Sequence, residues 1–173
     1  MYSDAPRWCP AYVGIGSNLD SPQDHVLTAI DELKSLSDSV VTGVSSLYRS
    51  APMGPADQDD YINAAAAILT QLSPHDFFSR LCTIEFSHGR KREGERWGPR
   101  TLDLDLLVFG ASQLDDDVLT VPHPGIGDRN FVLLPLNELA PHLIVPGLGS
   151  VASLTDTILR SGKRIEKIQD ELT

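Results

Sequence analysis

The stretch that decides the fold is residues 90–105, RKREGERWGPRTLDLD, with the apolar residues that follow it to Phe109. The segment 102–109 is apolar apart from Asp103 and Asp105, which predicts a strand. Side chains alternate between the two faces of a strand, so both carboxylates are expected on one face. Their Cα atoms would then lie about 6.5–7 Å apart, close enough for both to reach one magnesium ion or a close pair.

Five basic residues stand before this strand: Arg90, Lys91, Arg92, Arg96 and Arg100. Cations that can hold an anion therefore precede oxygen ligands that can hold a metal, which suits the handling of a nucleotide triphosphate. The alternative is a sheet edge whose polar residues face water. The basic segment beside the two aspartates favours metal ligation.

Elsewhere, the hydrophobic pattern predicts three more strands and two helices. With 102–109, the predicted strands are 11–17, 40–48 and 61–70. Helices are expected from Ser21 and Ser73, where a serine N-cap precedes a proline at the first helical position. The alanines of 61–70 also have helical propensity, but its short length between breakers favours a strand. The order β-α-β-β-α-β predicts an α+β fold with a ferredoxin-like core, an antiparallel sheet with both helices on one face.

The C-terminal part adds further elements to this core. We expect a short extended segment at 119–124, a helix over 131–139 and a short helix opened by Ser153. These additions place helices on both sides of the sheet, a three-layer α/β/α arrangement. Residues 1–10 are predicted to be a flexible arm, 11–160 a single domain, and 161–173 a charged tail.

Composition limits the partners. With 14 basic and 24 acidic residues, the net charge of −10 disfavours nucleic acid and fits a small anionic ligand on a local basic patch. No stretch approaches the roughly 18 apolar residues of a membrane span, and the N-terminus lacks a signal pattern. Cys9 and Cys82 are expected to be reduced thiols. We therefore expect a cytoplasmic protein without a membrane partner.

Gly14 and Gly16 stand towards the end of the first predicted strand and precede the first helix. They could form a phosphate cradle, but the third glycine of a dinucleotide fingerprint and the Gly-Lys-Ser/Thr of a P-loop are missing. A tight turn packed against the site is favoured.

His123 stands between two prolines that hold its imidazole in one place; the alternative is a rigid turn with an exposed histidine.

Tyr61 and Asn63 share a strand face, and an aromatic ring beside an amide suits a flat heterocycle. Alternatively, they are a core tyrosine and a capping asparagine. The other histidines are predicted to lie at the surface: His25, His75, His88 and His142.

Six segments, in order and covering about residues 11–145, resemble one known family. They are GIGSNL at 14–19, YRSAPMGP at 48–55, DYINA at 60–64, Glu85 with Gly89-Arg90, RWGPRTLDLD at 96–105, and LTVPH at 119–123. The chain resembles the 6-hydroxymethyl-7,8-dihydropterin pyrophosphokinases of folate biosynthesis, and the 96–105 string is highly specific to them. The resemblance implies transfer of pyrophosphate from ATP to the pterin's hydroxymethyl group, releasing AMP.

The resemblance also implies roles for individual residues. Asp103 and Asp105 would hold two Mg²⁺ ions and, with Arg90, Arg92 and Arg100, carry catalysis. The residues implied to meet ATP are Glu85, Arg90, Arg92, Trp97, Arg100, Leu106, Thr120, His123 and Arg129. Those implied to line the pterin pocket are Ser50, Met53, Tyr61, Asn63, Trp97 and Phe131. The expected partners are ATP and the pterin, and the expected state is a monomer.

The chain departs from the family pattern at four positions. Val118 stands where some members carry arginine, Ala51 where proline is frequent, Pro124 where some carry tyrosine, and Gly125 where a basic residue is expected. These departures leave the reaction intact and concern nucleotide affinity.

The implied reaction needs no protein nucleophile, so catalysis would rest on positioning and charge neutralisation. The loops 51–60 and 89–100 are the expected lids that exclude water. The rival interpretations are an inactive nucleotide- or pterin-binding module, an RNA-binding domain on the same topology, and a metal-dependent phosphohydrolase. The two aspartates argue against the first. The acidic charge argues against the second, and the third would need a residue that activates water.

Overall fold

The computed structural model describes residues 7–90, 99–162 and 165–168. Its main sheet is antiparallel and has the order β10-β3-β4-β1-β5, with β2 also pairing with β4. The strands of this sheet are β1 (Cys9–Ser17), β2 (Ser39–Val44), β3 (Tyr48–Ser50), β4 (Tyr61–Thr70), β5 (Asp103–Phe109) and β10 (Glu166–Lys167). Two small hairpins join β6 (Leu114–Asp115) to β7 (Thr120–Val121) and β8 (Ile144–Val145) to β9 (Gly149–Ser150).

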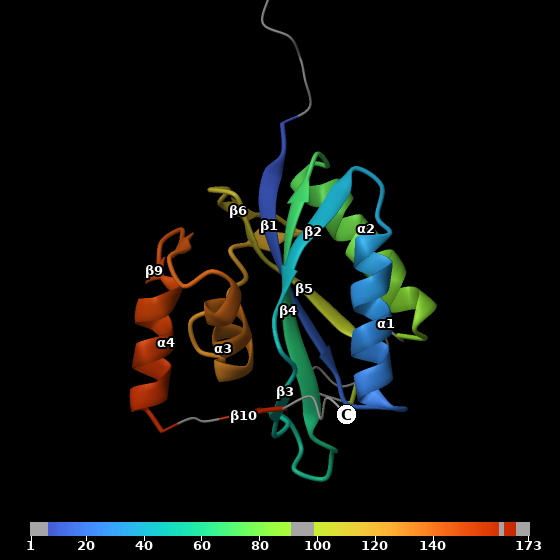
Figure 1. Cartoon of the computed structure of the whole chain (residues 1–173), viewed down its shortest axis with the longest axis vertical. Coiled ribbons are helices and arrows are strands. Elements are labelled where there is room, and N and C mark those ends of the chain that lie inside the picture. Colours follow the sequence, from blue (N-terminus) through green and yellow to red (C-terminus); the bar gives the residue numbers. More distant parts are fainter. Residues whose placement is uncertain (1–6, 91–98, 163–164, 169–173) are drawn as a thin grey trace, which may run out of the picture.

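Helices flank the sheet on two sides (Figure 1). On one side lie α1 (Pro22–Lys34) and α2 (Pro74–Ser87), and on the other lie α3 (Asn130–Leu139) and α4 (Val151–Arg160). The predicted α+β class is therefore confirmed. No helix within the described residues is long and apolar enough to cross a membrane.

The two predicted helix starts differ in how they are capped. At α2 the Ser73 side chain accepts a hydrogen bond from the Asp76 N–H, as an N-cap serine should. At α1 the backbone of Ser21 is left-handed, with φ 66°, and its side chain makes no cap hydrogen bond. Both serines stand at the N-cap position with a proline next, as predicted, but only the Ser73 side chain forms the capping hydrogen bond.

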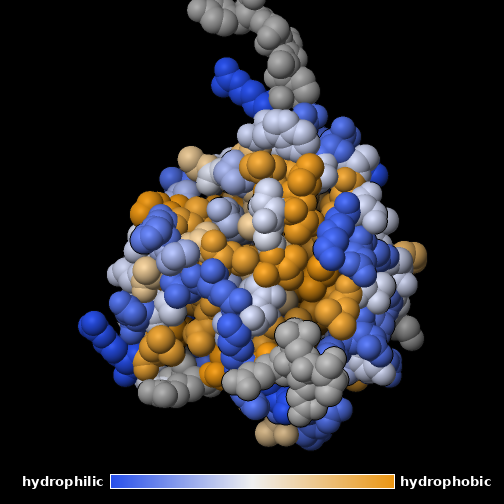
Figure 2. Space-filling model, in the orientation of Figure 1, coloured by the Kyte–Doolittle hydropathy of each residue, from blue (hydrophilic) through white to orange (hydrophobic). Residues whose placement is uncertain are grey.

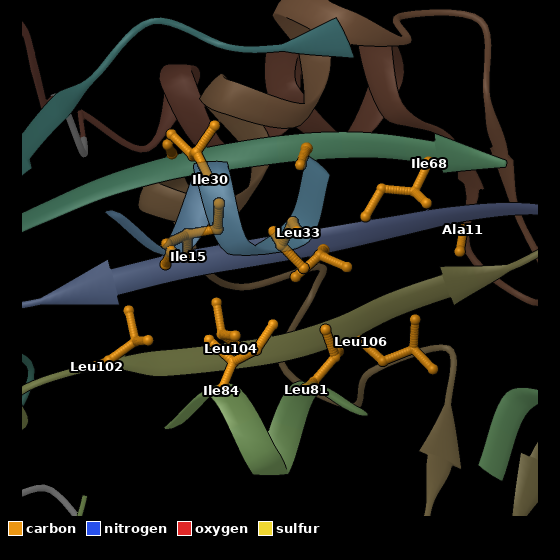
Figure 3. Close-up of a cluster of buried hydrophobic side chains, with 14 of the residues drawn as sticks. Ala11, Ile15, Ile30, Leu33, Ile68, Leu81, Ile84, Leu102, Leu104 and Leu106 are labelled. Carbon is orange, nitrogen blue, oxygen red and sulfur yellow. The ribbon is translucent and has the colours of Figure 1, made fainter. Parts of the chain in front are cut away.

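The main core lies between the sheet and helices α1 and α2. Leu104 and Leu106 point from β5 towards Leu81 and Ile84 of α2 (Figure 3). Because successive strand residues face opposite ways, Asp103 and Asp105 are directed to the other face of the sheet. A second apolar cluster, which includes Leu136 and Val151, packs α3 and α4 together beside that face.

The surface seen in Figure 2 carries hydrophobic residues over the middle of this view and hydrophilic residues around its margins. Val40 of β2 and Leu69 of β4 are exposed and pair across the two strands. The sheet is therefore partly uncovered beyond the helices.

The segment 40–48, predicted as one strand, forms two. Between β2 and β3, the Ser46 N–H and hydroxyl donate to the Glu138 carboxylate of α3 at 3.0 and 2.8 Å. The Tyr48 hydroxyl donates to the same carboxylate at 2.7 Å. Ser45 still donates its N–H to the Ala65 carbonyl of β4 at 2.9 Å, but Ser46 bonds to Glu138 instead. The strand is interrupted at 45–47, so the single-strand prediction is wrong.

Element boundaries also differ at both ends of the chain. β1 begins at Cys9, within the predicted arm 1–10, because it pairs with β4 up to Thr70. α4 begins at Val151 rather than near Ser153, because the Ser150 hydroxyl accepts the Ser153 N–H and so caps the helix. Within the predicted tail, Glu166–Lys167 forms β10, which pairs with β3.

Two helices are joined by a buried histidine. The Nε2 atom of His88 lies 2.7 Å from Glu32 Oε2, and its Nδ1 lies 2.7 Å from His25 Nδ1. The His88 side chain is only 7% exposed, so the prediction of a surface histidine is wrong there. Cys9 and Cys82 are not joined in a disulfide, in agreement with the expectation of reduced thiols.

Candidate active site

A pocket of about 300 Å³ opens on the face of the sheet to which Asp103 and Asp105 are directed. Its walls come from β1, the loop after β3, β4, β5 and the segment around the start of α3. Gly14 and Gly16 lie in its floor, where they pair with Asp105 and Asp103 of β5. Both glycines lie within strand β1, so the prediction of a tight turn is wrong, and their missing side chains leave room above the sheet.

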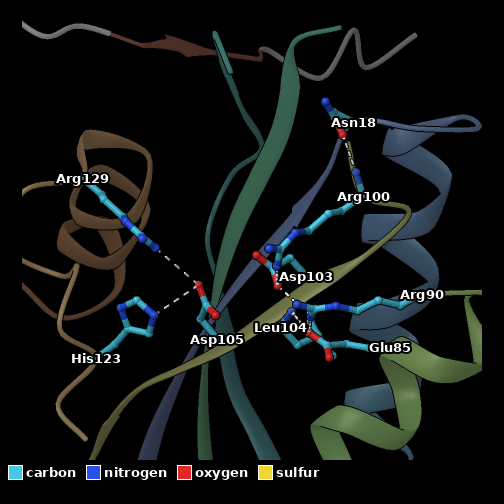
Figure 4. A network of polar contacts seen from close by, with 9 residues as sticks. All are labelled: Asn18, Glu85, Arg90, Arg100, Asp103, Leu104, Asp105, His123 and Arg129. Carbon is cyan, nitrogen blue, oxygen red and sulfur yellow. Dashed lines mark hydrogen bonds and ion pairs between the residues drawn. The ribbon is translucent and has the colours of Figure 1, made fainter. Parts of the chain in front are cut away.

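The Asp103 carboxylate lies between two guanidinium groups (Figure 4). Its Oδ1 is 2.7 Å from Arg90 Nη1 and 3.0 Å from Arg100 Nη1. Glu85, buried on α2, also contacts Arg90 and accepts the Leu104 N–H at 2.7 Å. Burial raises the pKa of Glu85 to about 7, although the Leu104 bond and Arg90 act to lower it. Glu85 thus ties α2 to both Arg90 and strand β5.

The Asp105 carboxylate lies on the opposite side of the pair. Its Oδ2 is 3.7 Å from His123 Nε2 and 3.8 Å from Arg129 Nη1. Burial and the charge of Asp103 raise its pKa to about 7, and the attraction of Arg129 does not outweigh them. Burial, with Arg129 next, lowers the pKa of His123 to about 4. The imidazole is therefore neutral near pH 7, and its contact with Asp105 is not an ion pair there.

The two carboxylates fit a hard divalent cation. A buried acid whose charge is disfavoured by a second carboxylate is stabilised when a cation binds between them. Within 7–90, 99–162 and 165–168, no group of three or more His, Cys, Asp or Glu side chains is placed to hold a metal. Magnesium commonly takes one or two carboxylates and completes its shell with phosphate oxygens and water. Asp103 and Asp105 therefore match the protein ligands that magnesium commonly uses.

Arg129 approaches the pocket across a glycine. A Cβ atom at Gly125 would lie 2.5 Å from Arg129 Nε, so the guanidinium occupies the space of a side chain at position 125. The guanidinium carbon is also 5.9 Å from the centre of the Phe131 ring, within the range of a cation–π contact. Arg129 therefore places a basic group where a side chain at position 125 would stand.

The other end of the pocket is aromatic and amide-lined. Asn63, 4% exposed, donates from Nδ2 to the Ser50 hydroxyl at 2.9 Å, and both line the pocket with Tyr61 and Phe131. Burial raises the pKa of Tyr61, so its hydroxyl stays protonated near neutral pH. Met53 lines the mouth and is 57% exposed. A flat ring with hydrogen-bonding edges fits this end.

The comparisons with known proteins identify the family. A model of the family described as 7,8-dihydro-6-hydroxymethylpterin-pyrophosphokinase matches residues 12–141, which include every residue that lines the pocket. The chain belongs to this family.

Curated relatives carry the same activity in their names. A Haemophilus influenzae protein is 42% identical over 144 residues, which are 83% of this chain and 89% of the relative. A Pseudomonas aeruginosa protein is 47% identical over 135 residues, 78% of this chain and 83% of the relative. Both are called 2-amino-4-hydroxy-6-hydroxymethyldihydropteridine pyrophosphokinase.

Solved structures share the fold. A Plasmodium falciparum HPPK-DHPS triple mutant with STZ-DHP matches 94% of this chain with a TM-score of 0.73 and 13% sequence identity. This chain spans 45% of that chain, somewhat under half of its length. At this identity the likeness concerns the fold alone.

Not every residue that the pyrophosphokinase resemblance implied lines the pocket. The Leu106 side chain is in the main core, and the Thr120 hydroxyl donates to Asp115 Oδ1 at 2.9 Å within the β6–β7 hairpin. Glu85 and Arg90 stand behind Asp103 rather than in the pocket wall.

Arg92 and Trp97 lie outside the described residues, as does most of the predicted lid 89–100. Sequence reasoning also missed Pro124 and Val132, which line the pocket. Pro124 could have been found because it adjoins the predicted His123. For Val132, the sequence shows only that it lies in an apolar helix, which does not indicate a place in the pocket.

Proposed function

We propose that this protein transfers the pyrophosphoryl group of ATP to the hydroxymethyl group of 6-hydroxymethyl-7,8-dihydropterin, releasing AMP, as a step of folate biosynthesis. Membership of the pyrophosphokinase family supports this proposal. The observation that carries it is one pocket in which the Asp103–Asp105 pair faces one end and the Asn63–Ser50 amide and hydroxyl face the other. The two ends match the two substrates, a triphosphate and a flat heterocycle.

The pterin end provides recognition through hydrogen bonds and stacking. The Asn63 carboxamide donates from Nδ2 to Ser50, which fixes its orientation, and its Oδ1 lies 3.4 Å from the place of a Cβ atom at Gly16, which lines the pocket. Tyr61 and Phe131 offer ring faces on which a heterocycle can stack. Such a site rejects rings that lack matching donors and acceptors, because a buried amide left unpaired is costly.

The phosphate end neutralises charge. Asp103 and Asp105 would hold two magnesium ions, which when bound supply Lewis-acid stabilisation of phosphate oxygens. Arg100 and Arg129 stand on either side of the carboxylate pair and present guanidinium groups, which suit phosphate oxygens. We include Arg92 among the phosphate ligands on the strength of the family resemblance.

His123 contributes as a neutral donor. Its Nδ1 accepts the Gly125 N–H at 3.0 Å, which assigns the remaining proton to Nε2. Because burial lowers the pKa of this imidazole, the Nε2–H group is present without a positive charge near pH 7. It lies 3.7 Å from Asp105 Oδ2 and is thus placed to donate to an oxygen bound beside that carboxylate.

The reaction requires no covalent intermediate with the protein. The pterin hydroxyl attacks the β-phosphorus, and the oxygen of AMP leaves in line. The chain's residues align the two substrates and exclude water, and this positioning is worth several orders of magnitude in rate. Of the two predicted lids, loop 51–60 lies within the described residues, and its Met53 stands at the mouth of the pocket on the pterin side.

We also propose that the sheet and its helices form a ferredoxin-like core within a three-layer α/β/α domain. The order of the sheet strands and the helices on both sides support this assignment. The monomeric state and the cytoplasmic location stay predictions.

A product assay tests the proposed activity. Purified protein is incubated with ATP, magnesium and the hydroxymethyl dihydropterin, and the nucleotides are separated by chromatography. AMP should accumulate in equal amounts with the pterin diphosphate, and only when the pterin is present. Asp103→Asn should remove the product, whereas the control Asp117→Asn, in an exposed loop, should not. Formation of ADP or orthophosphate would contradict the proposal.

A further inference from the structure

Asn18 joins three segments of the chain through one buried carboxamide. It follows β1, is 1% exposed, and donates from Nδ2 to the Asp59 carbonyl at 3.1 Å and to Gln58 Oε1 at 3.3 Å. Its Oδ1 accepts the Arg100 N–H at 2.8 Å, and its own N–H donates to the Arg100 carbonyl at 3.0 Å. Figure 4 shows the contact with Arg100 at the edge of the carboxylate network.

The two segments held by Asn18 form different walls of the pocket. Gln58 and Asp59 belong to loop 51–60, which contributes Met53 to the pterin end. Arg100 leads into β5, and its guanidinium lies 3.0 Å from Asp103 at the phosphate end. A shift of either segment therefore changes the hydrogen bonds available to the other.

We propose that Asn18 is a positioning residue that couples loop 51–60 to the segment entering β5, so that the pterin end and the phosphate end of the pocket form together. This proposal rests on the proposed function. Asn18 touches neither end itself; it acts through the backbone of Asp59 and Arg100. Coupling of this kind is reciprocal, so a nucleotide that orders the Arg100 segment strengthens pterin binding, and the pterin strengthens nucleotide binding by the same factor.

Two substitutions separate the hydrogen bond of Asn18 to Arg100 from its hydrogen bond to Asp59. Asn18→Asp keeps an oxygen that accepts the Arg100 N–H, but it places a second oxygen against the Asp59 carbonyl. The Asp59 carbonyl cannot donate to that oxygen, so this hydrogen bond is lost. Asn18→Ala removes both hydrogen bonds and leaves the Arg100 N–H and the Asp59 carbonyl without this partner.

Asn137→Ala is the matched control. Asn137 lies on α3, outside the pocket lining, and among the described residues its Oδ1 is buried without a hydrogen-bond partner. This variant removes the same carboxamide without touching loop 51–60 or the Arg100 segment.

The experiment measures coupling by calorimetry. The affinity for 6-hydroxymethylpterin is determined with and without α,β-methylene-ATP and magnesium, for wild type and the three variants. We expect the nucleotide analogue to strengthen pterin binding at least about fivefold in wild type and in Asn137→Ala. The coupling ratio is the pterin affinity with the nucleotide analogue divided by the pterin affinity without it. This ratio should fall to near one in Asn18→Asp, while the affinity of that variant for the nucleotide alone stays within about twofold of wild type. Asn18→Ala should lose the ratio and also bind nucleotide more weakly.

Amide hydrogen exchange without ligands gives the second readout. The Arg100 N–H should exchange at least about tenfold faster in Asn18→Ala and stay protected in Asn18→Asp, whereas amides of 51–60 should exchange faster in both. A wild-type ratio retained in Asn18→Asp, a ratio near one in wild type, or loss of the ratio in Asn137→Ala would overturn the proposal. If wild type binds neither ligand, the proposed function fails, and exchange alone decides whether Asn18 joins the two segments.

Discussion

Replacing Asp105 by asparagine should make the metal-free protein more stable while removing its activity. Burial and the neighbouring Asp103 raise the pKa of Asp105 from its ordinary value of 3.8 to about 7. A shift of this size corresponds to about 4 kcal/mol against the ionised form. The side chain is 30% exposed, and screening by water reduces this to about 2 kcal/mol. The attraction of Arg129 is already included, because it is one of the influences on that pKa.

The pH dependence follows from the direction of the shift. The folded pKa of Asp105 lies above the unfolded one, so the folded state binds the proton more tightly. The contribution of the wild-type carboxyl to stability is therefore lost as pH rises from about 4 to about 7. Asparagine does not titrate, so the advantage of Asp105→Asn should be small near pH 4 and complete above pH 7.

Urea unfolding in the presence of a chelator checks this reasoning. Wild type, Asp105→Asn and the exposed-loop control Asp117→Asn are compared at pH 4 and pH 8. We expect Asp105→Asn to gain about 2 kcal/mol at pH 8 and the control to match wild type. With magnesium and ATP the order should reverse, because only wild type binds them tightly. A variant no more stable than wild type at pH 8, or one with the same gain at pH 4, would refute the reasoning.

Three further outcomes are expected. Tyr61→Ala and Phe131→Ala should each weaken pterin binding by about 0.5–1.5 kcal/mol beyond lost area, with nucleotide affinity nearly unchanged; calorimetry showing unaltered pterin affinity would contradict the stacked ring. Arg92→Ala should slow the single-turnover rate at least about tenfold with little loss of nucleotide affinity, and stopped flow showing the opposite pattern would make the loop a static clamp. Glu138→Ala should lower the free energy of unfolding by about 1–3 kcal/mol, because it removes the acceptor of two Ser46 hydrogen bonds; a loss below about 0.5 kcal/mol in urea would show that this contact is replaceable.

Local pattern was enough to predict much of the fold. The alanine-rich segment 61–70 was predicted as a strand from its length between breakers, and it forms β4 with those bounds. The spacing of Asp103 and Asp105 in a strand predicts that both carboxylates share one face of β5, and both line the pocket while Leu104 and Leu106 lie in the main core.

Contacts between distant residues account for most of what the sequence could not predict. The break at 45–47 depends on Glu138, 92 residues away from Ser46 in the chain. The pairing of Glu166–Lys167 with β3 depends on a short edge strand that no periodicity in a charged segment reveals. Ser21 resembles Ser73 in sequence, and only the left-handed backbone distinguishes it.

In the candidate site, too, features within one segment could be predicted from the sequence, and features that depend on packing between elements could not. The spacing of Asp103 and Asp105 could be interpreted directly, because a strand fixes the relation between neighbours in sequence. The exclusion of Leu106 from the pocket follows from the same alternation, which directs it to the face opposite Asp103 and Asp105. The place of Glu85 behind Arg90 instead follows from the packing of α2 on β5, and no pattern within a single segment contains that information.

The contact between Arg129 and Gly125 implies that these two positions cannot be changed independently. Any side chain at 125 would displace the guanidinium by its first carbon atom, so Gly125→Ala should act on the site as a partial loss of Arg129. Conversely, a chain that lacked the arginine could place a basic side chain at 125 and fill the same volume. A basic residue at either position 125 or position 129 could thus place its positive charge at the same point beside Asp105. When relatives are compared, a substitution at either position is informative only together with the residue at the other.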